Sequence, residues 1–350
     1  MFTHISMAWF WIAGILVAAA VCVRLYMMPN ANQYRPDMTG RYAIVVGATA
    51  GIGVEMARIL AQLGAKVIIT GRDKVRAAKV VEMLNKEKND RGDDVLPVEF
   101  YECDLADLSQ VKEFANKMKS KIPQLDILVN NAATVPSTLQ RTKQGLEMTM
   151  GTNYISLFYM TSQLFPLIKK SKEARVVNVA AGLYVMASKI WSKLPDGSNN
   201  YEDILLDKLE EKDYSNIPAY GKSKLGNILF AKSLARKMEE AGLNHIKTAS
   251  HHPGVIKTEL TRDFNPVLIA IGNIIMPIFC VSPWYGAQTA MVQACCPADK
   301  IFNGGYYSDC KPVALNSLGK DAKLEDQYWN TAVRRIKEIT GDDAFGGEFK

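Results

Sequence analysis

The sequence predicts an α/β fold in which one doubly wound parallel sheet carries helices on both faces. Short apolar runs rich in β-branched residues alternate with longer helical patterns between residues 42 and 250. Such alternation is typical of parallel strands joined by crossover helices. The strand-like runs are apolar throughout, which indicates a sheet that is covered on both faces. A length of 350 residues suits one large domain of this kind.

Each element is predicted from its local pattern. Apolar β-rich runs predict strands at residues 42–46, 66–70, 97–102, 126–129, 175–179 and 246–250. Helical periodicity predicts helices at residues 52–63, 74–86 and 324–339. We assign residues 41–320 to the catalytic domain and residues 321–350 to a C-terminal helix and tail.

A glycine-rich turn joins the first predicted strand to the first predicted helix. It runs from Gly47 to Gly53 and includes Thr49, Gly51 and Ile52. Glycines in this position let the backbone approach a pyrophosphate, and the helix N-terminus supplies amide donors. A glycine turn alone can also reflect tight packing, but its place between strand and helix favours a Rossmann-type dinucleotide site.

The end of the second strand indicates which dinucleotide is bound. An acidic residue there would hydrogen-bond a ribose diol, but the sequence has Arg72, followed by Asp73. A guanidinium can pair with a 2′-phosphate, so we expect NADP(H) to be preferred over NAD(H). The alternative is a surface arginine that pairs with Asp73.

Tyr220 and Lys224 are the candidate catalytic pair. They lie four residues apart in a helix-forming segment, so their side chains share one helical face. A neighbouring ammonium lowers the pKa of a phenol from its usual value of about 10. We therefore expect Tyr220 to exchange a proton with substrate, unless Lys224 is only a solvated surface lysine.

Several further motifs occur in a fixed order along the chain. They are Asp104-Leu105, the run Asn130-Asn131-Ala132-Ala133, Asn153, and the segment that contains Pro253, Gly254, Val255 and Thr258. Together with the glycine turn and the Tyr220–Lys224 pair, they resemble the short-chain dehydrogenase/reductase family from about residue 40 to about residue 315. Ala133 stands where the family's NNAG motif has glycine.

The resemblance implies a role for each motif. Asp104 and Leu105 would contact the adenine, and Asn131 and Ala132 would lie against the cofactor. Asn153 would hold a proton-relay water near Lys224. The segment 253–258 would close over the nicotinamide.

Two runs, at residues 219–227 and 285–289, look most like the retinol-dehydrogenase-type branch of this family. Members of that branch are commonly membrane-anchored, NADP-dependent and active on lipophilic alcohols and carbonyls. The resemblance thus implies an oxidoreductase whose substrate is a retinoid, sterol, polyprenoid or long-chain lipid.

One catalytic position departs from the family pattern. The fifth strand leads into Ala180 and Ala181, where the family has Ser-Ser, so the catalytic serine is replaced by Ala181. Loss of one such hydrogen-bond donor costs roughly a hundredfold to a thousandfold in rate. Three interpretations stay open: another donor serves, with candidates Tyr184, Ser188 and Ser192; the enzyme reduces a conjugated C=C bond; or the protein binds cofactor as a scaffold or sensor with little turnover.

The first 28 residues are predicted to form a transmembrane anchor helix. The run from Ile5 to Val23 has no Asp, Glu, Lys or Arg, and its extension to Met28 is long enough to cross a hydrocarbon core of about 30 Å. A cleaved signal peptide and a monotopic insertion are the alternatives, although no Lys or Arg precedes the run. Arg24, Arg35 and Arg41 follow it, which places the catalytic domain on the cytosolic side of the membrane. We expect this membrane to be the endoplasmic reticulum or the surface of a lipid droplet.

Residues 29–40 are polar with two prolines and are predicted to link the anchor to the catalytic domain. The apolar stretch 264–281 is expected to form a substrate lid that dips into lipid. A buried core helix is the alternative for this stretch. A lipid-facing lid implies a substrate that is drawn from the bilayer.

Composition excludes several other classes of protein. The net charge of +6 is spread over 42 basic and 36 acidic residues, which predicts a solvated surface and no nucleic-acid binding. The six cysteines form no CxxC pair and no metal-ligand spacing, so we expect neither a disulfide framework nor a metal site. A homo-oligomer is left open.

Overall fold

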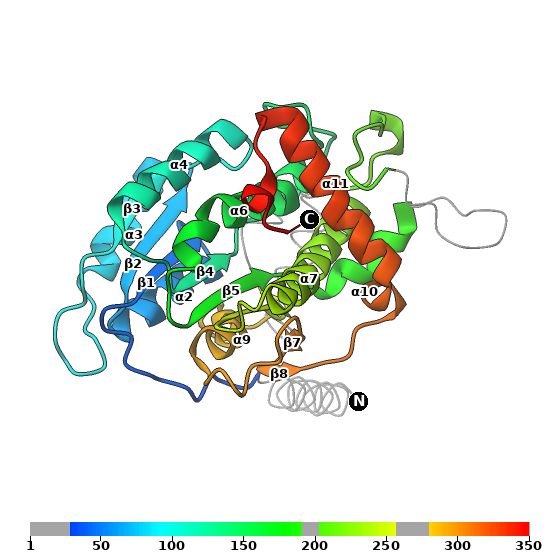
Figure 1. Ribbon diagram of the computed structural model, residues 1–350. Helices are drawn as coiled ribbons and strands as arrows, with labels where there is room; N and C mark the ends of the chain where they lie inside the picture. The colour runs from blue at the N-terminus through cyan, green and yellow to red at the C-terminus, as the bar shows by residue number, and fades with distance from the viewer. Residues whose placement is uncertain (1–28, 191–202, 257–279, 350) are drawn as a thin grey trace, which may run out of the picture.

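Eight strands form a single sheet in the computed structural model, which describes residues 29–190, 203–256 and 280–349. The strand order is β3-β2-β1-β4-β5-β6-β7-β8, and neighbouring strands are parallel except for β7 and β8 (Figure 1). The order reverses between β1 and β4, and in open α/β sheets this reversal creates a crevice at the carboxyl ends of the strands. The strands are β1 (Tyr42–Val46), β2 (Lys66–Gly71), β3 (Glu99–Glu102), β4 (Ile127–Asn130), β5 (Ala174–Val179), β6 (Ile246–His252), β7 (Tyr306–Ser308) and β8 (Lys311–Pro312).

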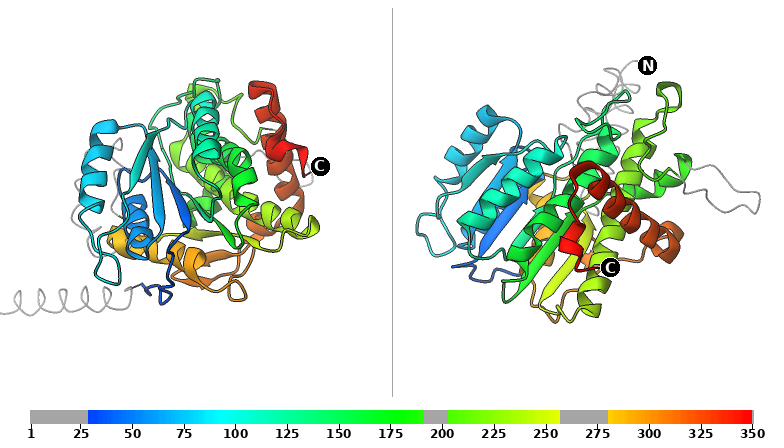
Figure 2. Two further views of the ribbon diagram at one scale, coloured as in Figure 1. Left: turned by 60° about the vertical axis from the view of Figure 1, so that its left-hand side comes forward. Right: turned by 45° about the horizontal axis from the view of Figure 1, so that its top comes forward.

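Helices cover both faces of the sheet, as the sequence predicts. One face packs against α2 (Ile52–Gln62), α3 (Lys74–Leu84) and α9 (Pro283–Cys295). The other packs against α4 (Leu108–Lys121), α6 (Ser156–Ile168) and α7 (Asn216–Glu240), and α11 (Ala322–Thr340) lies outside α7. The left view of Figure 2 shows the sheet between these layers. The shorter helical elements are α5 (Met148–Met150), η1 (Gly151–Ile155), η2 (Gly182–Ile190), η3 (Glu211–Asp213), α10 (Ser317–Lys320) and η5 (Ala344–Gly347).

The two faces of each central strand belong to different hydrophobic clusters. In β1, Ile44 and Val46 face the α4–α6–α7 side, whereas Ala43 and Val45 face the α2–α9 side. Successive side chains of a strand point to opposite faces, so a strand buried on both sides is apolar at every position. This explains the continuous apolar runs in the sequence.

Polar side chains mark the beginning of several helices. Asp73 accepts a hydrogen bond from the backbone N–H of Arg76 at the start of α3, and Asp107 accepts one from Ser109 at the start of α4. Asp321 does the same for Leu324 in α11, which ends at Gly341 with φ of 75°. Such caps satisfy backbone groups that have no partner inside the helix.

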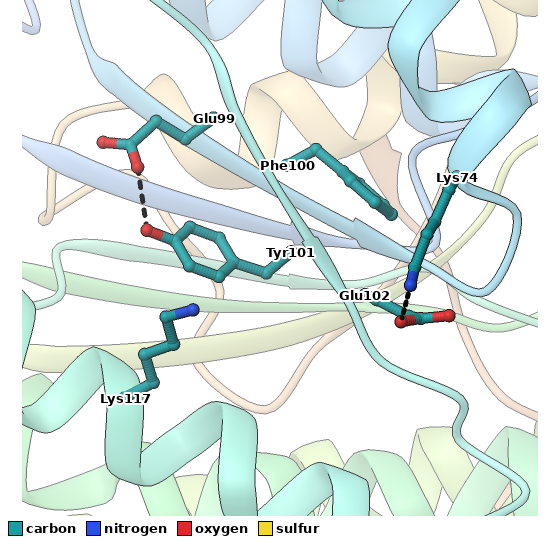
Figure 3. Close-up of a pocket in the computed structure, with 6 residues that line it drawn as sticks. All are labelled: Lys74, Glu99, Phe100, Tyr101, Glu102 and Lys117. Atoms are coloured by element: carbon teal, nitrogen blue, oxygen red, sulfur yellow. Dashed lines mark hydrogen bonds and ion pairs between the residues drawn. The ribbon is translucent and has the colours of Figure 1, made fainter.

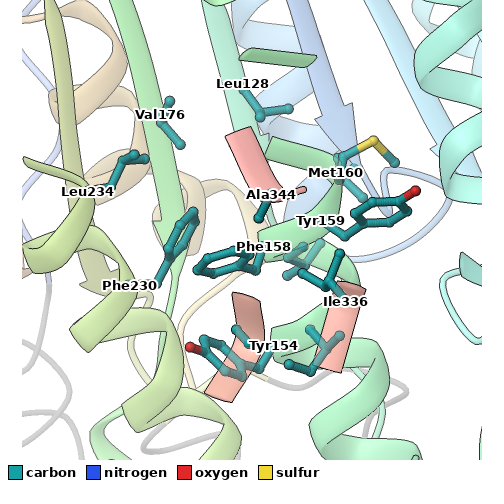
Figure 4. Close-up of a cluster of buried hydrophobic side chains, with 14 of the residues drawn as sticks. Leu128, Tyr154, Phe158, Tyr159, Met160, Val176, Phe230, Leu234, Ile336 and Ala344 are labelled. Atoms are coloured by element: carbon teal, nitrogen blue, oxygen red, sulfur yellow. The ribbon is translucent and has the colours of Figure 1, made fainter. Parts of the chain in front are cut away.

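The C-terminal segment is part of the core. Trp329 of α11 stacks on Phe345 with ring centroids 5.4 Å apart, and both rings contact Phe158 of α6. Figure 4 shows Phe158 between Phe230 of α7 and the C-terminal residues. The predicted helix 324–339 corresponds to α11, and burial of Trp329 ties that helix to the sheet's α6–α7 layer.

The segment 29–40 is extended and held against the domain. The Asn30 side chain donates to an Asp309 carboxylate oxygen at 2.6 Å, and the backbone N–H of Asn32 donates to Gln288 at 3.2 Å. Arg35 pairs with Asp90 at 2.6 Å. The predicted linker is therefore fastened at several points along its length.

The β7–β8 hairpin was missed, because strands of three and two residues carry no readable periodicity. The predicted anchor at residues 1–28 lies outside the described residues. Within the described ranges, no helix has the length and apolar content to span a bilayer.

Trp329→Ala should destabilise the domain strongly. The side chain is 4% exposed, and removal of a buried tryptophan typically costs about 3–5 kcal/mol. Urea unfolding would measure the change. Val75→Ala, at a position 71% exposed on α3, is the matched control and should change the unfolding free energy by less than about 0.5 kcal/mol. Equal effects of the two variants would contradict the packing described here.

Candidate active site

A cavity of about 620 Å³ lies at the carboxyl ends of the strands. It is lined at one end by the glycine turn and the residues after β2, and at the other by Tyr220, Lys224 and the residues after β5 and β6. The crevice created by the strand-order reversal is thus a single elongated site. Its size and position fit a dinucleotide together with a small substrate group.

The glycine turn brings two backbones together. A Cβ on Gly47 would lie 2.6 Å from the Cβ of Ala132, and Gly51 has φ of 62°, so both positions require glycine. The Asn131 side chain donates to the Gly47 carbonyl at 2.8 Å and holds the turn against β4. No side chain caps the N-terminus of α2 at Gly51, which leaves its first amides for an anion.

Two arginines lie at the end of the cavity beside β2. Arg72 follows β2 and Arg76 lies in the first turn of α3, and both line the cavity. Asp73 caps α3 and pairs with Arg76 at 3.5 Å. Within the described ranges no ion pair joins Arg72 to Asp73, the alternative that the sequence left open.

Tyr220 and Lys224 lie on one face of α7, directed toward β5. The Lys224 Nζ donates to the backbone carbonyl of Val179 at 2.8 Å, and Asn227 donates to the same carbonyl at 3.2 Å. The Nζ atom lies 5.5 Å from the centre of the Tyr220 ring. Lys224 is 1% exposed, so it is not a solvated surface lysine.

The surroundings of Tyr220 are apolar. Its ring packs in a cluster with Val135 and Ala181, and Ala133 lies against this cluster. Burial raises the pKa of Tyr220 above its usual range and lowers the pKa of Lys224 to about 7. The expected lowering of the phenol pKa by Lys224 is therefore wrong for the protein alone, because burial disfavours the charged form of both groups.

Asn153 is buried behind the cavity wall and holds Thr134, a residue that lines the cavity. Its side chain accepts from the Thr134 N–H at 2.7 Å and donates to the Thr134 carbonyl at 2.9 Å and to Ser223 at 3.1 Å. These bonds use its amide in positioning the cavity-lining Thr134, and the proton-relay water that the resemblance implies stays a prediction. Asn153 lies in the π-helical turn η1, a feature that often occurs at functional sites.

Similarity to known proteins shows the family to which this chain belongs. A model of the short chain dehydrogenase family matches residues 41–193. Mouse retinol dehydrogenase 14 is 33% identical over 302 residues, which cover 84% of this chain and 85% of that protein. The chain belongs to the short-chain dehydrogenase family. Human retinol dehydrogenase 14 is 32% identical over 335 residues, covering 91% of this chain and 94% of the relative.

Solved structures agree with this assignment. An uncharacterised protein from Mycobacterium paratuberculosis has a TM-score of 0.64 and 26% identity, covering 89% of this chain and 96% of the other. The RhlG/NADP active-site complex from Pseudomonas aeruginosa has a TM-score of 0.57 and 25% identity, covering 78% of this chain and 95% of the other. This short-chain dehydrogenase is thus an oxidoreductase with a nicotinamide-cofactor fold.

Most of the predicted site residues come together in the cavity. Those that line it are Gly47, Thr49, Gly51, Ile52, Arg72, Asp104, Leu105, Asn131, Ala132, Tyr220, Lys224, Pro253, Gly254 and Val255. Gly53 lies behind the turn, where a Cβ would meet the Gly47 carbonyl at 2.6 Å. Thr258 lies outside the described residues.

Neither described candidate for a replacement donor reaches the cavity of this short-chain dehydrogenase. The Tyr184 hydroxyl accepts from the Asn316 backbone N–H at 3.0 Å, and its ring packs edge-on against Tyr306. Ser188 is bonded within its own turn, to the Val185 carbonyl at 3.4 Å. Ser192 lies outside the described residues.

Sequence reasoning missed several groups that line the cavity, including Arg76, Thr134, Thr152 and His252. Arg76 lies in the first turn of α3, whereas Arg72 precedes the helix, so helical spacing does not relate the two residues and gave no signal. His252 is directly before the Pro253-Gly254 motif. The face of β6 to which its side chain points depends on the pairing of β6 with β5, which the sequence alone does not show.

The predicted closing segment begins at the cavity. Gly254 has φ of 85°, and the Val281 N–H donates to the Val255 carbonyl at 2.8 Å. This pairing brings the two ends of the stretch between residues 256 and 281 together beside the cavity wall. The predicted lid 264–281 lies outside the described residues except for its last two.

A second, shallow hollow lies at the edge strand β3 (Figure 3). Lys74 pairs there with Glu102 at 2.8 Å, and the Tyr101 hydroxyl donates to Glu99 at 2.9 Å. Lys117 lies over the Tyr101 ring at 4.7 Å. These paired charges protect an exposed sheet edge, so the hollow is not the catalytic site.

Lys224→Met should change how stability depends on pH. The pKa of Lys224 is about 7 in the folded protein and 10.5 ordinarily, so between these values the unfolded chain binds more protons. The unfolding free energy of the wild type should therefore rise, relative to that of the variant, as pH increases from 7 toward 10.5. Urea unfolding across this range would measure it, with Lys79→Met on exposed α3 as a control for loss of one charge. A pH-independent difference would contradict the described burial.

Proposed function

We propose that this short-chain dehydrogenase is an NADP(H)-dependent oxidoreductase that interconverts a lipophilic alcohol and the corresponding carbonyl compound. The observation that supports the proposal is a single cavity with two arginines at one end and a buried tyrosine–lysine pair at the other. The arginine end suits a phosphorylated ribose. The Tyr220 end is apolar and suits a hydrocarbon substrate.

Preference for NADP(H) is supported by charge at the β2 end. Arg72 and Arg76 both line the cavity beside Thr49, and a pair of guanidinium groups can hold a 2′-phosphate through charge-assisted hydrogen bonds. The related RhlG structure is described as an NADP complex. Asp73, which directly follows Arg72, is occupied in capping α3 and pairing with Arg76.

The protonation state of Tyr220 suits carbonyl reduction. When bound, a reduced nicotinamide would supply the hydride. A phenol is neutral near pH 7 already at its usual pKa of about 10, and burial raises the pKa of Tyr220 further, so its hydroxyl can donate a proton to the carbonyl oxygen. Lys224, held by the Val179 carbonyl, lies where it can contact the nicotinamide ribose and stabilise the tyrosinate left by that transfer.

The substrate end is consistent with a lipid-soluble compound. Val135, Ala181, Leu183 and Val255 line it, and Leu183 and Val255 are exposed at its mouth. The similar proteins named retinol dehydrogenase 14 support a retinoid or another long-chain alcohol or aldehyde. We further propose that residues 1–28 and the 264–281 lid bring the domain to a membrane, with the endoplasmic reticulum or a lipid droplet as the site of action.

Ala181 favours a second candidate function. An alanine methyl offers no donor to a reacting oxygen, so the protein could bind NADP(H) with little turnover, as a scaffold or sensor, or could reduce a C=C bond conjugated to a carbonyl. A panel of retinaldehyde, decanal and 2-decenal with NADPH distinguishes these functions. Alcohol products support the main proposal, a saturated aldehyde supports C=C reduction, and binding without any product supports the sensor.

Tyr220→Phe should remove carbonyl reduction and leave NADPH affinity within about twofold, because only the proton donor is lost. Turnover is followed by NADPH absorbance and binding by nucleotide fluorescence. Tyr184→Phe, which removes a buried hydroxyl outside the cavity, is the matched control. Wild-type turnover in Tyr220→Phe would remove Tyr220 from the proposed role.

The double variant Arg72→Ala/Arg76→Ala should reverse the cofactor preference. Loss of charge-assisted bonds to the 2′-phosphate should weaken NADPH binding by roughly tenfold or more and leave NADH binding nearly unchanged. Isothermal titration with both nucleotides measures the ratio. Arg334→Ala, on exposed α11, controls for net charge. An equal loss for NADPH and NADH would contradict 2′-phosphate recognition by these arginines.

A further inference from the structure

His252 lies beside the position of the missing serine. The strands β5 and β6 are parallel neighbours, with Val179 opposite His251, and the Ala180 N–H donates to the His251 carbonyl at 2.8 Å. By this register His252 follows opposite Ala180, one residue before Ala181, at the same edge of the sheet. Both line the cavity, as do Tyr220 and Lys224.

The imidazole ring packs against the backbone directly after Ala181. A Cβ placed on Gly182 would lie 3.5 Å from His252 Nε2 and 3.6 Å from Cδ2. Its Nε2 edge thus lies within one residue of the site where the family places its serine hydroxyl.

The ring nitrogens are available to a ligand. Within the described ranges the buried Nδ1 atom has no hydrogen-bond partner, and Nε2 has none either. An unpaired buried acceptor is tolerated better than an unpaired N–H, which favours the tautomer with the proton on Nε2. Burial also lowers the pKa of His252, so the ring is neutral near pH 7 and carries one N–H.

We infer that His252 is a catalytic residue whose Nε2–H donates a hydrogen bond to the reacting carbonyl oxygen, in place of the hydroxyl that Ala181 lacks. The inference rests on the proposed carbonyl reduction. Hydride reaches the carbonyl carbon from the reduced nicotinamide, the Tyr220 proton reaches the oxygen, and His252 keeps its proton throughout. The imidazole acts by stabilising charge on the oxygen, which is the role of an oxyanion donor.

His251, the neighbouring histidine, cannot take this role. It points to the opposite face of β6, where its Nδ1 lies 2.9 Å from Gln293 of α9. The side-chain alternation of a strand therefore selects His252.

A double-mutant cycle tests the inference with NADPH and decanal. His252→Ala should lower kcat by roughly a hundredfold to a thousandfold and leave NADPH affinity unchanged. His252→Gln, which keeps an N–H donor, should retain part of the activity. Ala181→Ser should restore activity at least about tenfold in the His252→Ala background and have a much smaller effect in the wild type, since only one donor is needed.

His245→Gln is the matched control, because this histidine lies before β6 at the opposite end of the same strand and contacts the Lys169 carbonyl. It should keep wild-type kcat. A His252→Ala kcat within about twofold of wild type, or an equal effect of Ala181→Ser in both backgrounds, would overturn the inference while leaving carbonyl reduction intact.

A second readout needs no turnover. The chain has four histidines, so the imidazole ¹⁵N signal of His252 can be assigned with His252→Gln. Decanamide, whose carbonyl is not reduced, should shift the His252 Nε2 signal when added to the NADP⁺ complex and leave the His245 signal in place. Absence of this shift overturns the inference. A shift without reduction of any aldehyde supports His252 as the donor and rejects the proposed function.

Discussion

The hydrogen bond from Lys224 Nζ to the Val179 carbonyl joins helix α7 to the end of β5, and the candidate site depends on it. Asn227 donates to the same carbonyl, so one backbone oxygen holds two successive turns of the helix. This attachment brings Tyr220 against Ala181 and closes the inner end of the cavity. Lys224 itself is buried, and burial disfavours its charged form, so the pKa of Lys224 falls to about 7. Helix α7 is thus positioned by the Lys224 amine, whose protonation state depends on its surroundings in the site.

Burial acts on both partners of the Tyr220–Lys224 pair. The phenol and the amine both lie in apolar surroundings, and both are shifted toward their neutral forms. A neutral phenol is a proton donor, which suits the reductive direction. The same apolar surroundings leave the reacting oxygen without the usual hydroxyl, because Ala181 contributes only a methyl group. Polar groups that can compensate must come from neighbouring strands, and β6 supplies the imidazole of His252.

The sequence predicted those parts of the structure that are encoded locally. Apolar runs gave six strands within a few residues, and the glycine turn marked the cofactor end because Gly47 and Gly51 need conformations or contacts that only glycine permits. Features that depend on register were not predictable. The direction of His252 follows from its pairing with β5, and the engagement of Asn153 with Thr134 follows from a π-helical turn. Tyr184 and Ser188 do not line the cavity, so the prediction that one of them replaces the serine hydroxyl was wrong. Their closeness to Ala181 in the sequence does not determine the direction of their side chains in η2.

The fastening of residues 29–40 has a mechanical consequence. Asn30 is bound to Asp309 and Arg35 to Asp90, so the chain leaves the domain at the turn between β7 and β8. A flexible linker of twelve residues would let a membrane-anchored enzyme rotate and sample all orientations. Because residues 29–40 are bound to the domain, this rotation is prevented, and the position of residue 29 sets the orientation of the whole domain. If the first 28 residues enter a bilayer, the cavity mouth would keep one constant tilt toward the surface, and its supply of substrate would depend on lateral diffusion in two dimensions.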